Sequence, residues 1–338
     1  MDSITLNNGV GMPRLGFGTY LIPEDKFEST ICEAYDMGYR QFDTAWRYYN
    51  EVALVNALKN HHVRREDVFI TTKVNADALY KHPYYYGWKM IQNIPTRTIE
   101  DAVEESLRNL DWGGYVDLFL VHFPWPMFMK MYKVLDKFYK QGRIRAIGVS
   151  SFLPPHIEAL KEISDTIPAV NQFEISPLNT QKNLIKYCQD KGIAVEAMST
   201  FSHFRSLEPR QEIVENELIR AIADKHGKST VQVVLRWLYQ QDVILIPKTW
   251  HIPHMKENIS IFDFFLDDED MLKIDSLDEG RFLNYDPYNA VRFGIPKKYR
   301  NWEGFKNPSN FSDAHNRRPW YERFLYYLIN NYGFDLSR

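Results

Sequence analysis

Cysteine is scarce in this chain: only Cys32 and Cys188 occur among 338 residues, and both stand in stretches with the apolar spacing of a helix. Two isolated thiols exclude a fold built on disulfides and favour small core residues in a reducing compartment. Long apolar runs are also missing, since none approaches the roughly 18 residues of a membrane-spanning helix, and the first thirty residues lack the successive parts of a secretory signal. We therefore expect a soluble, cytoplasmic protein without a membrane partner.

The sequence has no excess of either charge. Lys and Arg number 41 against 44 Asp and Glu, a formal net charge of -3, which gives no electrostatic reason to expect nucleic acid as a partner. Clustered metal ligands are absent too, because the pair His61 and His62 has no Cys or carboxylate at ligand spacing. This pattern argues against a metal-dependent hydrolase or lyase, and we expect no bound metal.

What the sequence does contain is a regular alternation of short apolar runs and amphipathic helical stretches between residues 14 and 262. Such an alternation is typical of parallel strands joined by crossover helices. Eight units in series close most naturally into a (β/α)8 barrel, an α/β fold, with an open doubly wound sheet as the alternative. One connecting helix should begin after Asn179, which can serve as its N-cap. The predicted strands are Arg14 to Gly18, Gln41 to Asp43, Val68 to Lys73, Val116 to His122, Ile144 to Ser150, Ala169 to Phe173, Ala194 to Met198 and Val243 to Pro247.

Two segments flank the alternation. Residues 4–13 indicate a small β-hairpin with Asn8 and Gly9 in its turn, which we expect to plug the bottom of the barrel. Residues 1–280 are predicted to form the barrel domain, and 281–338 an aromatic extension of loop and helix that is not an independent domain. One face of that helix is too apolar to stay in water and carries Trp320, Phe324, Tyr327 and Leu328. We expect the extension to dock as a lid on its own barrel, giving a monomer, or at a homo-oligomer interface.

Polar residues end three of the predicted strands. Asp43, Lys73 and His122 each close an otherwise apolar run, and Tyr48 follows the first of them by five residues. A strand end can carry charge simply because the chain emerges into solvent there. The carboxyl ends of parallel strands meet at one edge of a sheet, however, and burying an ionisable group costs several kcal/mol unless it is paired or useful. The set therefore predicts one shared site at that edge.

These four side chains suit proton transfer to a carbonyl group. An ammonium ion beside a phenol stabilises the phenolate, so Lys73 should pull the pKa of Tyr48 from about 10 toward neutrality. Asp43 would keep Lys73 charged and in place, and the N–H of His122 would help Tyr48 to polarise a carbonyl oxygen. None of these groups can deliver a hydride. We therefore predict a nicotinamide cofactor and a small-molecule carbonyl substrate.

Eight motifs make the chain resemble the aldo-keto reductases over about residues 3 to 285. They are PRLGFGT (13–19), FDTAWRYYNE (42–51), TTKV (71–74), DLFLVHFP (117–124), IGVSSF (147–152), AVNQFEISP (169–177), LRWL (235–238) and IPKTWHIPHMKEN (246–258). The resemblance implies a (β/α)8 barrel and an NAD(P)H-dependent oxidoreductase that converts an aldehyde or ketone to the alcohol. It also implies a catalytic tetrad of Asp43, Tyr48, Lys73 and His122, with Tyr48 as the general acid.

The resemblance further implies two sets of binding residues. The cofactor would contact Gly18, Thr19, Asp43, Ser150, Ser151, Gln172, Met198, Ser199, Lys248, Thr249, His254, Glu257 and Asn258. The substrate pocket would be lined by Tyr20, Trp46, Tyr48, His122, Phe123 and Trp125. The pocket is thus expected to be apolar and aromatic.

The chain departs from the family's pattern at four positions. Ser151 stands for a usual Asn, and Tyr49 for a common Gly after the catalytic Tyr. Met198 replaces the aromatic ring that stacks on the nicotinamide, and His254 replaces an Arg that grips the 2′-phosphate. Because histidine is the weaker anion partner at neutral pH, we expect NADP(H) to be favoured and NAD(H) to be possible.

A second function is compatible with these departures. The same barrel could bind the nucleotide without turnover, as a redox-sensing or regulatory subunit, and the aromatic extension could be its partner surface. The complete set of Asp43, Tyr48, Lys73 and His122 argues against this alternative.

Overall fold

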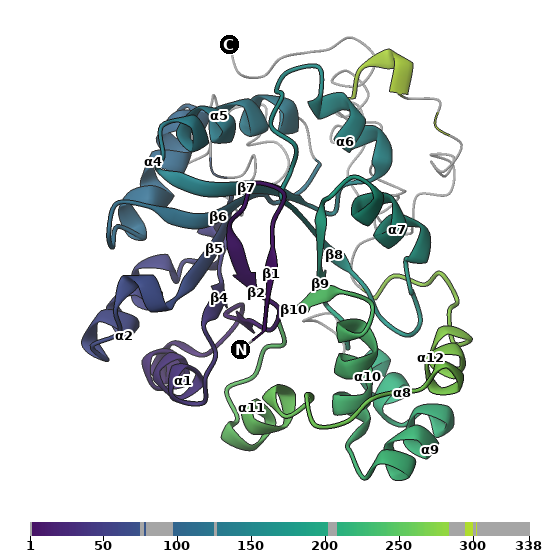
Figure 1. Ribbon diagram of the computed structural model, residues 1–338. Coiled ribbons are helices and arrows are strands. Elements are labelled where there is room, and N and C mark those ends of the chain that lie inside the picture. The colour runs from purple at the N-terminus through teal and green to yellow at the C-terminus, as the bar shows by residue number, and fades with distance from the viewer. Residues whose placement is uncertain are drawn as a thin grey trace, which may run out of the picture.

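A ring of eight parallel strands forms the centre of the computed structural model, which describes residues 2–74, 78, 97–124, 127–201, 208–283, 295–299 and 302 (Figure 1). The strands follow one another around the ring in chain order. A parallel bridge between Leu15 and Leu245 joins the last strand to the chain before the first, so the sheet closes. The predicted (β/α)8 barrel is confirmed. Its strands are β3 (Phe17–Gly18), β4 (Gln41–Asp43), β5 (Phe69–Val74), β6 (Val116–Val121), β7 (Ile144–Ser150), β8 (Val170–Glu174), β9 (Ala194–Met198) and β10 (Val243–Leu245).

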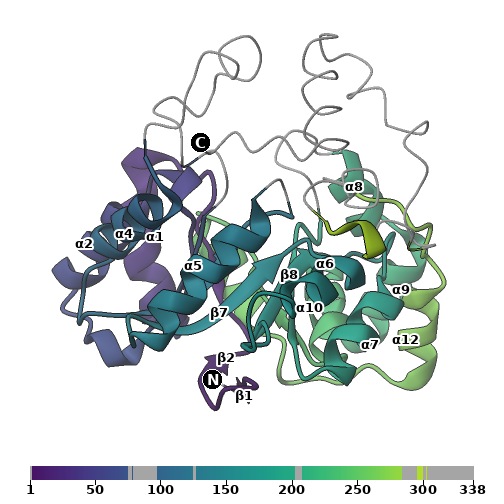
Figure 2. The same cartoon turned by 90° about the horizontal axis from the view of Figure 1, so that it is seen from above.

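An antiparallel hairpin of β1 (Ser3–Thr5) and β2 (Gly11–Pro13) lies against the amino-terminal ends of the barrel strands (Figure 2). Gly9 in its turn has a φ of 85°, a conformation that glycine adopts without strain. The hairpin side chains Leu6 and Met12 are buried in a cluster with the inward-facing residues Phe69, Leu118, Leu120, Ala146, Val170 and Ile244. The predicted plug is confirmed, and this end of the barrel is an apolar core.

Helices alternate with the strands and cover the outside of the barrel (Figure 1). The helix at 99–109 shows why they begin where they do, because Thr98 and Asp101 form a capping box at its start. Its predicted apolar face, with Ala102, Val103 and Leu107, is buried. The helices are α1 (Glu24–Asp36), α2 (Glu51–Asn60), α4 (Ile99–Asn109), α5 (Phe128–Lys140), α6 (Pro154–Leu160), α7 (Lys182–Asp190), α8 (Glu208–Val214), α9 (Glu217–His226), α10 (Thr230–Tyr239), α11 (Ile252–Ile259) and α12 (Asp268–Asp275), with 3-10 turns η1 (Trp46–Tyr48), η2 (Arg65–Asp67) and η4 (Lys297–Tyr299).

The predicted start of α7 is wrong. Asn179 exchanges two backbone hydrogen bonds with Ser176, so it belongs to a tight turn before the helix. The helix begins at Lys182, and its N-cap is Gln181 with a φ of 51°. The turn competes for the same asparagine because this residue type also favours turns.

Several predicted strand limits shift by one or more residues. The strand predicted from Arg14 shortens to β3, and the last strand ends at Leu245 because Pro247 has no N–H to extend the ladder. β6 ends one residue before His122, which therefore starts the following loop. Such shifts are expected where a strand runs into a loop.

Part of the carboxyl-terminal extension packs on the barrel. Ile295 is buried in the main core, and the Tyr299 hydroxyl donates to the Glu158 carbonyl of α6 at 3.5 Å. The predicted apolar helix with Trp320 and its neighbours lies outside the described residues, as does most of the loop after β5. None of the helices in the described ranges is long and apolar enough to cross a membrane.

Candidate active site

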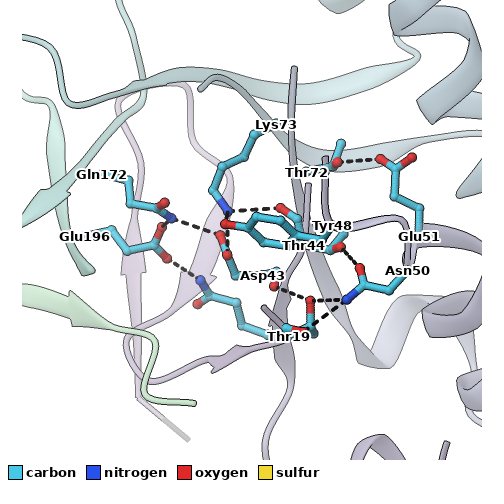
Figure 3. A network of polar contacts seen from close by, with 11 residues as sticks. Thr19, Asp43, Thr44, Tyr48, Asn50, Glu51, Thr72, Lys73, Gln172 and Glu196 are labelled. Atoms are coloured by element: carbon cyan, nitrogen blue, oxygen red, sulfur yellow. Dashed lines mark hydrogen bonds and ion pairs between the residues drawn. The ribbon is translucent and has the colours of Figure 1, made fainter. Parts of the chain in front are cut away.

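The ammonium group of Lys73 is the centre of a polar network inside the carboxyl-terminal end of the barrel (Figure 3). Its Nζ lies 2.5 Å from Asp43 Oδ1, 3.0 Å from the Thr44 carbonyl oxygen and 3.5 Å from the Tyr48 hydroxyl oxygen. Lys73 is 0% exposed, so all three of its donors are used within the protein. Burial opposes its charge, but Asp43 and Tyr48 raise the pKa of Lys73 above its ordinary value. Three of the four predicted residues are thus in direct contact.

A turn of chain after β4 carries Tyr48 to Lys73. The short helix η1 is followed by Tyr49, whose φ of 56° is a left-handed conformation that costs a non-glycine residue about 1–2 kcal/mol. Asn50 fastens this turn, because its Nδ2 donates to the Thr19 carbonyl at 3.0 Å and its Oδ1 accepts from Thr44 Oγ1 at 2.5 Å. Sequence reasoning assigned no role to Thr44 or Asn50, although Asn50 stands only two residues after Tyr48.

The expected low pKa of Tyr48 is wrong for this structure. Burial raises the pKa of Tyr48 to about 12 despite the opposing charge of Lys73. The prediction weighed the lysine but not the burial, which depends on tertiary structure. Tyr48 is therefore a neutral phenol at physiological pH.

His122 lies on the other side of Tyr48. The two ring centroids are 5.9 Å apart in an edge-on arrangement, and Phe123 stacks on His122 at 4.5 Å. Burial, with the charges of Lys73 and Arg47, lowers the pKa of His122 well below 6.5. Its Nδ1 has no hydrogen-bond partner in the described ranges. His122 is thus a neutral imidazole that can offer one N–H to a ligand.

A second carboxyl group, Glu196, extends the network through two amides. Gln172 Nε2 donates to Asp43 Oδ2 at 2.9 Å and to Glu196 Oε2 at 2.5 Å, and Gln41 Nε2 donates to Glu196 Oε1 at 2.5 Å (Figure 3). Sequence reasoning placed Gln172 by the cofactor and missed Glu196. The signal was available, because Glu196 interrupts an otherwise apolar strand.

The predicted nicotinamide-side residues lie at the ends of β3, β7 and β9. Thr19 donates through its N–H and its Oγ1 to the Asp43 carbonyl, at 3.0 and 2.9 Å. A Cβ on Gly18 would lie 3.0 Å from the Ile246 carbonyl oxygen, so this position tolerates little bulk. Ser150 Oγ is buried and has no partner among the described residues, which suits a polar amide such as a carboxamide. Ser151, with its N–H bonded to the Gln172 carbonyl, and Ser199 both have left-handed φ values, and Met198 is half-buried.

The predicted adenosine-side residues gather around α11. Lys248 has no ion-pair partner in the described ranges, and burial together with the charge of Arg210 lowers its pKa. Two neighbouring cations suit a phosphate group. Thr249 Oγ1 accepts the N–H of His251, whose ring lies 5.5 Å from that of His254. Of the other predicted residues, Asn258 is buried and Glu257 half-buried on α11; Arg210, on α8, was not anticipated.

Two of the predicted pocket residues lie close to Tyr48: Tyr20 packs against its ring, and Trp46 lies on the same turn, η1. The rings of Tyr20 and Tyr48 are 4.5 Å apart. Trp46 donates its Nε1 hydrogen to Glu105 Oε2 at 2.6 Å, and the Arg97 guanidinium lies 5.1 Å from the Trp46 ring centre. Trp125, the remaining predicted pocket residue, lies outside the described residues. Glu105 was not anticipated, because its helix is distant in sequence.

This fold and this polar group together define a barrel oxidoreductase that acts on carbonyl groups. The profile of the Aldo/keto reductase family matches residues 9–279, so the chain belongs to that family. It is accordingly an enzyme that uses a nicotinamide cofactor to reduce a carbonyl group.

Individual relatives agree with this assignment. Glyoxal reductase of Bacillus subtilis (strain 168) is 38% identical over 289 residues, which cover 85% of this chain and 96% of that protein. Morphine 6-dehydrogenase of Pseudomonas putida is 37% identical over 294 residues, covering 84% and 94%. Among solved structures, a variant of Gox0644 in complex with NADPH is 30% identical with a TM-score of 0.70, covering 83% of this chain and 96% of that one.

Proposed function

We propose that this reductase uses Tyr48 as its general acid, with Lys73 and Asp43 setting the position of Tyr48 and His122 orienting the carbonyl oxygen. The observation that carries the proposal is the fully buried Lys73, whose Nζ bridges Asp43 Oδ1 at 2.5 Å and Tyr48 Oη at 3.5 Å. Replacing a whole buried ion pair by well-packed apolar residues is often neutral or stabilising, so the buried Lys73 and Asp43 indicate a chemical role more than a structural one.

The residues divide the work of the reduction. A bound reduced nicotinamide supplies the hydride for the carbonyl carbon. Tyr48, with a pKa of about 12, is still a stronger acid than an aliphatic alcohol, whose pKa is close to the value of about 16 for water. Proton transfer from Tyr48 to the developing alkoxide is therefore favourable, and Lys73 stabilises the phenolate left behind. The neutral His122 donates its N–H to the same oxygen.

We propose NADPH as the preferred cofactor, with real use of NADH. Lys248 and Arg210 form a pair of cations at the end of the site where the adenosine phosphate would lie, and a structural relative was solved with NADPH. Thr19, Ser150 and Gln172 would hold the nicotinamide end. His254 instead of an arginine should reduce the margin over NADH.

The substrate proposed here is a small aldehyde or ketone that fits between aromatic side chains. Tyr20, Trp46 and Phe123 would form the wall around the reacting carbonyl. Glyoxal is the first compound to test, because the glyoxal reductase relative shares 38% of its aligned residues with this chain. Two further proposals concern the whole protein. The enzyme is proposed to be cytoplasmic, and its carboxyl-terminal extension to serve as a lid or an oligomer contact.

The test is a pair of measurements on one sample. Adding NADPH should quench tryptophan fluorescence, and adding glyoxal or another small carbonyl should then remove the absorbance of the reduced nicotinamide. Quenching without any carbonyl-dependent loss across a panel of aldehydes and ketones would favour the alternative of a regulatory, non-turnover subunit.

A further inference from the structure

A fully buried carboxyl group stands next to the proposed catalytic residues without belonging to them. Glu196 on β9 is 0% exposed and accepts hydrogen bonds from Gln172 and Gln41, each at 2.5 Å. The same Gln172 nitrogen donates to Asp43 Oδ2 at 2.9 Å (Figure 3). One amide N–H₂ group therefore joins two carboxyl groups, and Glu196 is linked to Lys73 through Gln172 and Asp43.

Glu196 forms no ion pair among the residues that the structure describes. The nearby Lys73 does not supply one, because its donors are taken by Asp43, Thr44 and Tyr48. A buried carboxylate held only by neutral amides is costly, and protonation relieves that cost.

A hydrogen-bond acceptor is available for the protonated form of the Glu196 carboxyl group. Gln41 Oε1 is buried and has no hydrogen-bond partner among the described residues. Because the oxygen and nitrogen of an amide are interchangeable by a half-turn, that oxygen can face Glu196 and accept a hydrogen bond from its protonated form. Gly16 makes room for Gln41, since a Cβ there would lie 2.7 Å from Gln41 Cδ.

We propose that Glu196 is a positioning residue of the reduction, and that its protonation state acts on Tyr48 through Gln172, Asp43 and Lys73. The inference rests on the proposed function of Tyr48. In the proton step, the Tyr48 O–H bond breaks and the alcohol O–H bond forms, while the hydride of the cofactor forms the new C–H bond. When Glu196 is neutral, Asp43 and Lys73 balance each other and Lys73 stabilises the phenolate. When Glu196 is charged, the added negative charge makes Tyr48 a weaker acid.

This change should occur in the physiological range. Burial and the charge of Asp43 raise the pKa of Glu196 to about 7, against the opposing effects of Gln172 and Lys73. On the adjacent strands, the residues paired with Glu196 are the uncharged Gln172 and Ile244. The titratable or charged residues on the other inward-facing positions are Asp43 on β4, Lys73 on β5, His122 after β6 and Glu174 on β8, which accepts the N–H of Leu283.

The test compares the pH dependence of kcat/KM and of single-turnover reduction in the wild type and in Glu196→Gln. The wild-type rate should fall about threefold between about pH 6 and pH 8, as a negative charge appears on Glu196 and weakens the acidity of Tyr48 through the network. Glu196→Gln should lose that inflection and match the low-pH rate throughout. This variant keeps the shape of the side chain, accepts from Gln172 and can donate to Gln41 Oε1, so the fold should be preserved.

Glu51→Gln is the matched control. Glu51 is also a buried carboxyl, 2% exposed, but it accepts from Thr72 Oγ1 at 2.6 Å and Asn109 Nδ2 at 2.9 Å on the outer side of the barrel wall. Its pKa is likewise raised by burial. Since no hydrogen bond in the described ranges joins Glu51 to Asp43, Lys73 or Tyr48, the pH profile of Glu51→Gln should equal that of the wild type.

A spectroscopic readout separates the inference from activity. In protein labelled with ¹³C at the glutamate carboxyl groups, one NMR signal should shift with pH near neutrality in the wild type. That signal should be absent from the spectrum of Glu196→Gln. If the wild type reduces carbonyl compounds, two results would overturn the inference about Glu196 but not the proposed function. One is an identical pH profile in Glu196→Gln, and the other is the absence of a carboxyl signal that titrates near neutral pH. A wild type that reduces no carbonyl compound would instead overturn the proposed function.

Discussion

The two ends of the barrel interior are built from the same strands and have opposite chemistry. At the amino-terminal end, Phe69 of β5 lies in an apolar cluster that the hairpin closes. Four residues later on the same strand, Lys73 lies among Asp43, Gln172 and Glu196. Alternation along each strand brings side chains of both ends to the inside, so position along the strand decides whether an inward side chain is apolar or charged.

The apolar end of the barrel interior mainly stabilises the fold, whereas the polar end carries the groups proposed for catalysis. The apolar end contributes to stability through the burial of the hydrophobic side chains in this cluster. The polar end holds Lys73 beside Asp43, and its stability depends on the buried ammonium and carboxylate keeping each other as partners. Substitutions at the apolar end should therefore lower the unfolding free energy alone, whereas substitutions at the polar end should also lower kcat/KM.

The largest effect is expected for Lys73→Met. Loss of the cation leaves a buried Asp43 unpaired, which should lower the unfolding free energy by about 3–5 kcal/mol, and it removes the support of the Tyr48 phenolate, which should lower kcat/KM by about 10² to 10⁴. Urea unfolding and steady-state kinetics measure both. Lys137→Met, which breaks an exposed pair with Glu100, is the control and should change neither quantity. Equal behaviour of the two variants would contradict the assigned role of Lys73.

Leu118→Ala should affect stability alone. Leu118 is 0% exposed in the apolar cluster, and truncation there should lower the unfolding free energy by about 2–5 kcal/mol. The folded variant should keep the wild-type kcat/KM at a temperature well below its midpoint of unfolding. A large loss of kcat/KM in fully folded protein would show that the two ends are not separate.

Glu196 should make the polar end pH-sensitive. Its folded pKa of about 7 lies above its ordinary value of 4.5, so between these values the folded protein holds a proton that the unfolded chain releases. The unfolding free energy should therefore fall as pH rises through this window, by on the order of 2–3 kcal/mol from this group. Glu196→Gln should lack this contribution and gain stability relative to the wild type at about pH 8. An identical slope in both proteins would contradict a raised pKa.

The smallest effect concerns cofactor choice at the outer rim of the polar end. An arginine binds a phosphate more tightly than a histidine does, because its guanidinium is always charged and can bind two oxygens at once. His254→Arg should therefore raise the preference for NADPH over NADH by roughly 3- to 10-fold. Titration of both cofactors by fluorescence quenching measures this, and an unchanged preference in the variant would contradict it.

Much of this molecule follows from local sequence patterns. The alternation of strands and helices predicts the barrel, and Asp43, Lys73 and His122 mark one edge because each ends an apolar run. These features are predictable because they depend on periodicity and on the geometry of parallel strands.

Other features depend on contacts between distant residues. The pKa of Tyr48 is raised because burial outweighs Lys73, and burial is a property of the assembled barrel. Glu196 meets Gln41 only because β4 and β9 face each other across the interior, 155 residues apart in sequence. Asparagine favours helix caps and turns alike, so the sequence alone could not decide which of the two Asn179 forms. The backbone pairing with Ser176 places it in a turn.

The most direct test of the account is single-turnover reduction by Tyr48→Phe. The variant lacks only the hydroxyl that faces Lys73 at 3.5 Å, so it should fold and quench with NADPH as the wild type does. With saturating NADPH and glyoxal or the best carbonyl found, its loss of reduced-nicotinamide absorbance should be slower by about 10² to 10⁴. Reduction at the wild-type rate would show that Tyr48 is not the acid and that the polar end of the barrel serves another purpose.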